Sequence, residues 1–194
     1  MGGKGVNTSQ GCVNLKEPII GSKVILREVR EEDAEFFARW YNEPEIMFEC
    51  GFIEPTSVEE ELKTIRNPQK DRDWYAITNL DGKLVGETYL LRINPTWHCT
   101  DMSMIIPNPD DQGMGYGSEA GQIMLDRAFN HHNMNRVAIG VVALNTQALE
   151  YWKRLGFKEE GIQQEGYFHD GVYSDFIMMR ILKREYIQKR RLYP

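Results

Sequence analysis

The residues best suited to chemistry form a glycine-rich turn between a predicted strand and a predicted helix. The turn reads Gln112-Gly-Met-Gly115-Tyr-Gly117-Ser118. Glycine lets the backbone approach a phosphate group without a Cβ in the way. The first turn of the following helix presents unpaired N–H groups at the positive end of the helix dipole. Residues 112–118 therefore predict a site for a ligand that carries phosphate groups.

The spacing within this turn separates the possible phosphate ligands. A dinucleotide-binding G-x-G-x-x-G motif would need glycine in place of Ser118, and no acidic residue is suitably placed for a ribose. A P-loop would need Gly-Lys-Ser/Thr, which is absent. The pattern Gln112-x-x-Gly115-x-Gly117 instead matches the Arg/Gln-x-x-Gly-x-Gly/Ala motif of the GNAT family of N-acetyltransferases, in which the loop binds the pyrophosphate of coenzyme A.

Other segments carry the same resemblance. Residues 145–157 contain Asn, Ala, Tyr and Gly-Phe in the order of a second GNAT motif. Residues 117–120 and 166–175 resemble the branch that holds the ribosomal-protein N-terminal acetyltransferases and the spermidine N-acetyltransferases. The chain is identified as a member of the GNAT family over about residues 23–186.

The resemblance implies direct transfer of an acetyl group from acetyl-CoA to a primary amine, without a covalent enzyme intermediate. It implies that Tyr151 is the general acid that protonates the departing thiolate, with an ordinary core tyrosine as the alternative. It implies that Asn145 bonds to the pantetheine arm, and a helix N-cap is compatible with that role. The expected acetyl-CoA contacts are the strand end Met104, Ile105 and Ile106, the turn residues Gln112, Gly113, Met114, Gly115, Tyr116, Gly117 and Ser118, and Asn145 and Tyr151.

The general base is harder to assign from the sequence. An alkyl ammonium has a pKa near ~10.4, so forming the neutral amine at pH 7 costs about 4–5 kcal/mol. Some family members carry a glutamate in the strand before residue 145, but Gly140 stands at the approximate position here. Asp101 is the hypothetical replacement, because it lies in the strand leading to the coenzyme loop, where relatives often have an acidic residue. It shares a strand face with Ser103, opposite Met102 and Met104. A solvated or salt-bridged aspartate is the alternative.

The segment from Glu31 to Glu61 predicts an acidic acceptor side. It contains eleven acidic residues and one basic residue, Arg39. In the family, the first two helices and their loop help to form the acceptor site. Glu49 and Glu54 are therefore candidate ligands for a cationic amine, and a solvated helix face is the alternative.

Three classes of acceptor fit these observations. A polyamine or another small cationic amine comes first, because of the acidic helices and the branch resemblance. A protein N-terminus comes second, since its α-amine has a pKa near ~8 and needs less help from a base. An amine antibiotic comes third, and a non-catalytic acyl-CoA-binding module is the alternative from another class.

Composition excludes several other functions. His131 and His132 are adjacent and cannot share a helix face, and His98 and His169 have no partner at ligand spacing, so we expect no metal. The three cysteines form no CxxC motif and suit a reducing cytoplasm. The net charge of −6 argues against general nucleic-acid binding, and no apolar run could span a membrane. The family resemblance implies a homodimer or a larger homo-oligomer.

Periodicity predicts one α/β (α+β) domain with a mixed sheet of about seven strands and about four helices. We expect residues 1–18 to be a flexible leader and residues 19–194 to form the single GNAT domain. Strands are predicted at 23–28, 74–79, 83–91, 98–106, 136–144, 158–168 and 172–182, and helices at 31–41, 57–65, 117–131 and 146–155.

Overall fold

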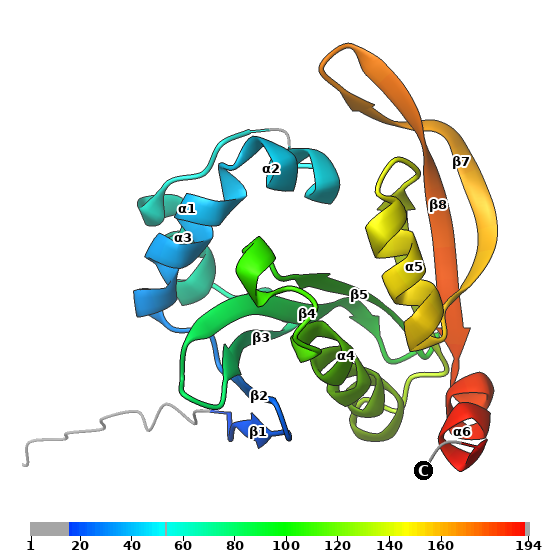
Figure 1. Cartoon of the computed structure of the whole chain (residues 1–194). Coiled ribbons are helices and arrows are strands. Elements are labelled where there is room, and N and C mark those ends of the chain that lie inside the picture. The colour runs from blue at the N-terminus through cyan, green and yellow to red at the C-terminus, as the bar shows by residue number, and fades with distance from the viewer. Residues whose placement is uncertain (1–15, 53, 193–194) are drawn as a thin grey trace, which may run out of the picture.

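One eight-stranded sheet runs through the chain, for which a computed structural model describes residues 16–52 and 54–192. Its strand order is β1-β2-β3-β4-β5-β6-β8-β7 (Figure 1). Neighbouring strands are antiparallel except for the parallel pair of β5 and β6. The strands are β1 (Ile19–Ile20), β2 (Val24–Arg27), β3 (Asp73–Asn79), β4 (Leu84–Asn94), β5 (Cys99–Ile105), β6 (Arg136–Val142), β7 (Lys158–His169) and β8 (Val172–Leu182).

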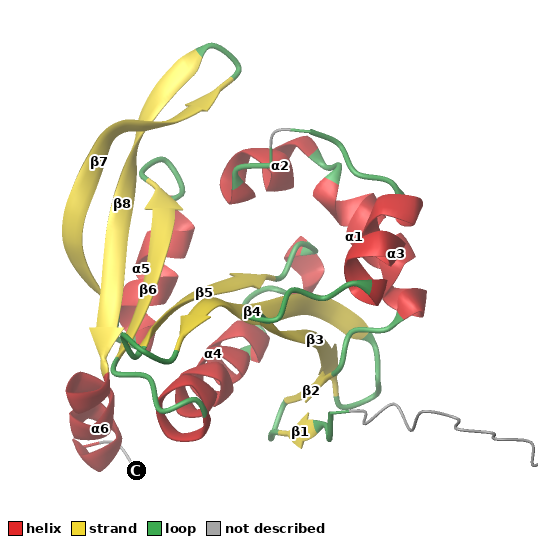
Figure 2. Ribbon diagram, turned by 180° about the vertical axis from the view of Figure 1, so that it is seen from behind, coloured by secondary structure: helices red, strands yellow, loops and turns green. Residues whose placement is uncertain are grey.

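Helices cover the two faces of this sheet unequally (Figures 1 and 2). The main core packs α4 and α5 against one face, through buried residues such as Met124, Leu125 and Trp152. A smaller core packs α1 against the other face, around Phe37 and Trp74. The helices are α1 (Ala34–Tyr41), α2 (Pro44–Cys50), α3 (Val58–Arg66), α4 (Tyr116–Asp126), α5 (Thr146–Leu155) and α6 (Lys183–Leu192), and Arg127–His131 extends α4 as one π-helical turn.

The predicted mixed α/β fold is confirmed, with additional elements. The short strand β1 raises the strand count to eight, and α2 and α6 raise the helix count to six. The predicted first helix ends at Tyr41, as expected, and Pro44 begins the additional helix α2. Proline is tolerated there, since the N–H group it lacks would have no partner in the first turn. Gly51 then ends α2 in the left-handed conformation, with φ 74°.

The parallel strands β5 and β6 separate toward their carboxyl ends. Their pairing joins Cys99–Asp101 to Arg136–Ala138 and stops there, whereas β5 continues to Ile105 and β6 to Val142. Figure 2 shows β6 rising away from β5. Ligands of open sheets bind outside the carboxyl ends of strands at such a point. We use the term crevice for this region where the two strands diverge, beside the starts of α4 and α5; it is defined by the loss of their pairing.

One carboxylate ties the first strands to α4. Glu119 Oε1 accepts hydrogen bonds from Ser22 N at 2.8 Å and Ser22 Oγ at 2.5 Å. Its Oε2 accepts from Lys23 N at 2.7 Å and Val24 N at 2.8 Å. Partial burial alone would raise the pKa of Glu119, but these hydrogen bonds outweigh it and lower the pKa. The turn between β1 and β2 is thereby fixed beside the start of α4.

The expected leader, residues 1–18, lies largely outside the described residues, but its end does not. Lys16 Nζ donates to Asp73 Oδ1 at 2.7 Å and stands 4.9 Å from the centre of the Tyr75 ring. Asp73 also accepts from Arg127 and His132. Lys16 therefore packs with the domain rather than belonging to a free leader. No helix in the described part of the chain has the length and apolarity needed to cross a membrane.

Candidate active site

The glycine turn lies at the mouth of the crevice, between the end of β5 and the start of α4. Gly113 and Gly115 have φ values of 72° and 87°, in the left-handed region that favours glycine. Gly115 is the N-cap of α4, and no side chain caps this helix. The first N–H groups of α4 are therefore available to a ligand, as anion binding at a helix N-terminus requires.

The predicted turn residues differ in their exposure to solvent. Gln112, Gly115, Tyr116 and Gly117 are partly buried, whereas Gly113, Met114 and Ser118 are exposed. The carbonyl of Met114 accepts a hydrogen bond from Lys23 Nζ at 3.2 Å, a neighbour that the sequence analysis did not identify. The turn thus presents backbone groups at its glycines, together with the exposed side chain of Met114.

The side chain of Gln112 holds the turn in place. Its Nε2 donates to the carbonyl of Ile106 at 2.9 Å, and its Oε1 accepts from Gln147 Nε2 at 3.1 Å. Gln112 thus connects the end of β5 to the first turn of α5. These bonds give the side chain a structural function, and its expected coenzyme contact stays a prediction.

Tyr151 projects from α5 to the inner end of the same turn. Its Oη donates to the carbonyl of Gly117 at 2.8 Å and lies 3.3 Å from Sδ of Met104. Burial raises the pKa of Tyr151 well above its ordinary value, so the hydroxyl keeps its proton at neutral pH. The structure therefore brings Met104, Gly117 and Tyr151 together at the crevice, with a proton donor among them.

Asn145 stands on the opposite wall of the crevice, just after β6. Its Oδ1 accepts from Ala148 N at 2.9 Å, which makes it the N-cap of α5. The structure thus shows the capping contact that the sequence analysis considered beside a role in binding pantetheine. On the facing wall, Ile105 is buried and Met104 and Ile106 pack partly buried against the main core.

Asp101 is not brought to Tyr151. It is the last residue of β5 paired with β6, so it lies at the closed end of the crevice. Its carboxylate accepts from Arg92 Nε at 2.5 Å. Met104 lies three residues further along β5, about 10 Å away at the usual rise per residue, and on the other face. The contact with Arg92 is the salt-bridge alternative considered for Asp101.

Side-chain packing explains the glycine at position 140, and the sequence did not reveal this explanation. A Cβ built at this position would lie 2.0 Å from Cε1 of Phe176 on the neighbouring strand β8. The ring of Phe176 thus occupies the space above Gly140. A glutamate there would require this ring to move, which accounts for glycine at the position where some family members have a base.

A second candidate site lies on the opposite face of the sheet, under α1 and α3. It is a cavity of about 250 Å³ that combines aromatic rings with carboxylates, and we call it the α1–α3 chamber. Its lining residues are Tyr41, Phe52, Glu54, Thr56, Glu61, Thr64, Arg72, Trp74, Glu87 and Tyr89.

Glu87 is the most buried carboxylate of this chamber, with 3% of its surface exposed. Burial raises its pKa, although Tyr41, Arg72 and Trp74 partly offset this effect. The indole Nε1 of Trp74 donates to Glu87 Oε2 at 2.5 Å. The sequence signal for this residue is the single carboxylate of a largely apolar strand, which the sequence analysis did not use.

The two predicted acceptor ligands lie in different places. Glu54 lines the α1–α3 chamber and is exposed to solvent. Glu49 lies near the end of α2 and is not among the lining residues, and burial and the neighbouring Glu45 raise its pKa. The structure therefore groups Glu54, but not Glu49, with the chamber.

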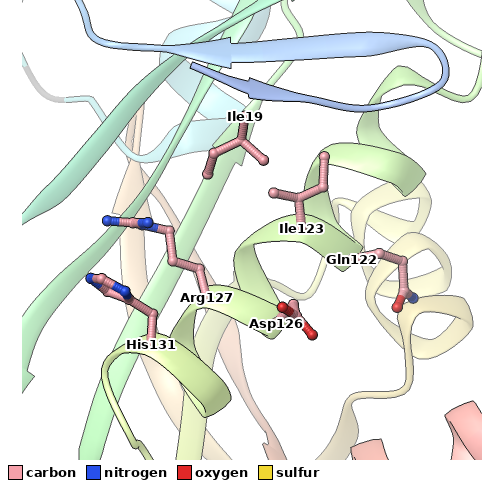
Figure 3. Close-up of a pocket in the computed structure, with 6 residues that line it drawn as sticks. All are labelled: Ile19, Gln122, Ile123, Asp126, Arg127 and His131. Carbon is pink, nitrogen blue, oxygen red and sulfur yellow. The ribbon is translucent and has the colours of Figure 1, made fainter. Parts of the chain in front are cut away.

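A further cavity of about 320 Å³ lies on the outer flank of α4 (Figure 3). Figure 3 shows Arg127 and His131 side by side at the end of this helix, with Ile19 contributed by β1. The remaining lining residues are Gln122, Ile123 and Asp126. None of the residues predicted to do chemistry lines this cavity, so it does not define the active site.

Comparison with known proteins decides the family. A family model described as the acetyltransferase (GNAT) domain matches residues 23–158. The chain belongs to the GNAT acetyltransferase family. It is accordingly an acetyl-CoA-dependent N-acetyltransferase, and the crevice between β5 and β6 has the position expected for its coenzyme.

Individual relatives of this acetyltransferase are polyamine enzymes by name. It is 27% identical to the spermidine N(1)-acetyltransferase of Vibrio cholerae, over 88% of this chain and 99% of that one. It is 26% identical to the spermidine N(1)-acetyltransferase of Escherichia coli K12, over 84% and 88% of the two chains. A crystal structure of the Vibrio cholerae enzyme in complex with CoA and spermine has a TM-score of 0.78 and 28% identity, covering 86% of this chain and 99% of that chain.

The absence of a metal stays a prediction. No group of three or more His, Cys, Asp or Glu side chains in the described residues is arranged to hold a metal ion. One solved structure of the Vibrio cholerae spermidine/spermine enzyme, 25% identical with a TM-score of 0.71, is a complex with manganese ions. Metal dependence therefore needs its own measurement.

Proposed function

We propose that this enzyme transfers the acetyl group of acetyl-CoA to a polyamine or another small cationic amine. The observation that carries the proposal is the placement of two unlike sites on the strand pair β4–β5. The coenzyme turn and Tyr151 meet β5 at Met104 on one face. On the other face, Glu87 and Tyr89 of the α1–α3 chamber belong to β4 and pair with Ile105 and Ser103.

The chemistry of the α1–α3 chamber suits an organic cation. Ammonium groups bind favourably over aromatic faces and beside carboxylates that are partly shielded from water. The chamber offers an aromatic ring, Phe52, and a carboxylate at its solvent side, Glu54. The relatives named as spermidine N-acetyltransferases, and the related structure with spermine, support the same class of acceptor.

Each part of the crevice has a proposed task. The first N–H groups of α4, at residues 116–118, hold the pyrophosphate of the coenzyme. Beyond Asp101 the edge of β5 that faces β6 has no strand partner among the described residues, so its backbone groups up to Ile105 can bond to the pantetheine arm, whereas the carbonyl of Ile106 already accepts from Gln112. Bound acetyl-CoA supplies the acetyl group and a thiolate leaving group.

Tyr151 is the proposed general acid. Its hydroxyl donates a proton to the departing sulfur as the C–S bond breaks, and it regains one from the amine nitrogen that forms the new amide, directly or through water. If the contact of Asp101 with Arg92 opens, Asp101 is the proposed base that accepts the proton of the ammonium. With this contact closed, water takes the proton that the incoming ammonium must lose.

A protein α-amino group is the second candidate acceptor. It is favoured by one observation, namely that the position of the usual glutamate is Gly140 and is covered by Phe176. An α-amine with a pKa near ~8 is partly neutral at pH 7, so it needs less help from a base than a polyamine does.

A thiol-release assay with a panel of amines tests the proposal. The panel contains spermidine, spermine and putrescine, a short peptide with a free N-terminus and an aminoglycoside, with a reaction lacking acceptor as the blank. We expect kcat/KM to be highest for a polyamine. Activity with the peptide alone would favour the second candidate. If no amine releases thiol above the blank, although acetyl-CoA raises the melting temperature, the chain is a binding module and the proposal is wrong.

A further inference from the structure

The α1–α3 chamber already contains a cation, the guanidinium of Arg72. This residue directly precedes β3, and its Cζ lies 4.0 Å from the ring centres of both Trp74 and Tyr89. The two rings belong to residues that pair directly across β3 and β4, so they project from the same face of the sheet. Arg72 is therefore held over two aromatic faces at once, in the geometry of a cation–π contact.

Two buried carboxylates, Glu61 and Glu87, line the chamber together with this guanidinium. The charge of Arg72 lowers the pKa of Glu61 and that of Glu87, against the larger effect of burial, which raises both. Within the described residues, the buried Nε of Arg72 has no hydrogen-bond partner. The guanidinium is thus held by ring faces and diffuse charge rather than by a specific bidentate pair. Such an environment selects for positive charge and not for one particular donor geometry.

We infer that Glu61, Trp74, Glu87 and Tyr89 form a cation cage and that Arg72 is its built-in occupant. This inference rests on the proposed function for its consequence in catalysis. With the cage filled, Glu54 is the remaining carboxylate of the chamber that an acceptor can approach from solvent. Arg72 is then a specificity-determining residue, since it prevents a second or third ammonium of a polyamine from entering the deepest part of the chamber.

Chemical rescue tests the cage without any measurement of activity. Arg72→Ala removes the guanidinium and leaves the rings and carboxylates in place. Methylguanidinium at ten times its dissociation constant should then raise the melting temperature of this variant by about 3–6 °C and leave the wild type unchanged. Arg66→Ala is the matched control, because Arg66 pairs with Glu31 on the surface. Equal shifts in all three proteins would show that Arg72 fills no cage.

A kinetic comparison tests the effect on specificity. Arg72→Met keeps apolar bulk in the chamber but removes the charge. This variant also replaces Arg72→Ala if the alanine variant does not fold. The ratio of KM for spermidine to KM for a monoamine such as hexylamine should fall about five-fold or more in this variant, because a further ammonium gains the cage. Arg72→Lys should leave the ratio close to that of the wild type. An unchanged ratio in Arg72→Met would overturn the specificity role. A wild type that acetylates neither amine would refute the proposed function, while the rescue experiment would still decide the cage.

Discussion

The proposed function assigns different means of ligand recognition to the two faces of the β4–β5 strand pair. On the α4–α5 face, the coenzyme turn uses consecutive backbone groups of residues 112–118, with positive φ at two glycines. On the α1–α3 face, the chamber is built from side chains of α1, α3, β3, β4 and the loop between α2 and α3. In the proposed function, a coenzyme shared by a whole family is bound by backbone, and the acceptor by side chains that substitution can change without altering the fold.

The two faces also differ in the charge that they offer. The first turn of α4 presents N–H groups, which suit the anionic pyrophosphate. The chamber presents Glu54, Glu61 and Glu87, partly balanced by Arg72. In the proposed function each face is complementary to one substrate, so substitutions on one face should leave binding on the other nearly unchanged.

The largest effect is expected from Gly115→Val on the coenzyme face. A β-branched residue is strained at φ 87°, and its side chain would crowd the turn, so acetyl-CoA should no longer raise the melting temperature. Gly82→Val is the matched control, because Gly82 has φ 86° and no atom within 4 Å of a Cβ built there. The control should lose similar stability yet keep the acetyl-CoA shift. A full shift in Gly115→Val would show that the turn does not bind the coenzyme.

Tyr151→Phe should lower kcat by ~10²-fold or more with little change in the affinity for acetyl-CoA, because only a proton donor is lost. Burial raises the pKa of Tyr151, so its proton is lost only at strongly alkaline pH, and kcat of the wild type should not decline between pH 7 and about 9 on its account. Tyr173→Phe, at an exposed tyrosine of β8, serves as the control. An unchanged kcat in Tyr151→Phe would assign the residue a purely structural role.

Glu54→Gln should affect the acceptor alone. Loss of one exposed carboxylate should raise KM for a cationic amine by up to about five-fold at low salt, and less at high salt. The affinity for acetyl-CoA should not change. Glu49→Gln is the paired variant, since Glu49 lies outside the chamber lining. Equal changes of KM in both variants would mean that general surface charge, and not the chamber, attracts the amine.

The smallest effect is expected from Asp101→Asn. The base hypothesis predicts a decrease of ~10²-fold near pH 7 that is largely recovered at higher pH. The contact with Arg92 instead predicts a decrease of less than about three-fold and parallel pH profiles of kcat/KM, because exposed ion pairs contribute little. A large, pH-dependent loss of kcat/KM would instead support Asp101 as the base. It would also mean that the closed end of the crevice takes part in binding or deprotonating the acceptor.

The contrast between a coenzyme turn built from backbone and a chamber built from side chains also explains what the sequence could predict. The glycine turn and Tyr151 follow local patterns, since their geometry depends on a few neighbouring residues, and they lie together at the crevice. The chamber depends on the register that pairs Trp74 with Tyr89 across two strands, which no local pattern specifies. Gly140 was interpreted through a missing glutamate, whereas its cause is a ring from β8, another long-range contact.

The four hydrogen bonds to Glu119 also constrain the order of events during synthesis. The turn at residues 22–24 leaves the ribosome early, but its acceptor carboxylate lies about 95 residues further along the chain. At the usual rate of elongation this separation corresponds to roughly 5–20 s. Throughout that interval the backbone N–H groups of residues 22–24, which later donate to Glu119, are bonded to water. The amino-terminal end of the sheet is thus completed by the helix that carries the coenzyme turn, so the two parts mature together.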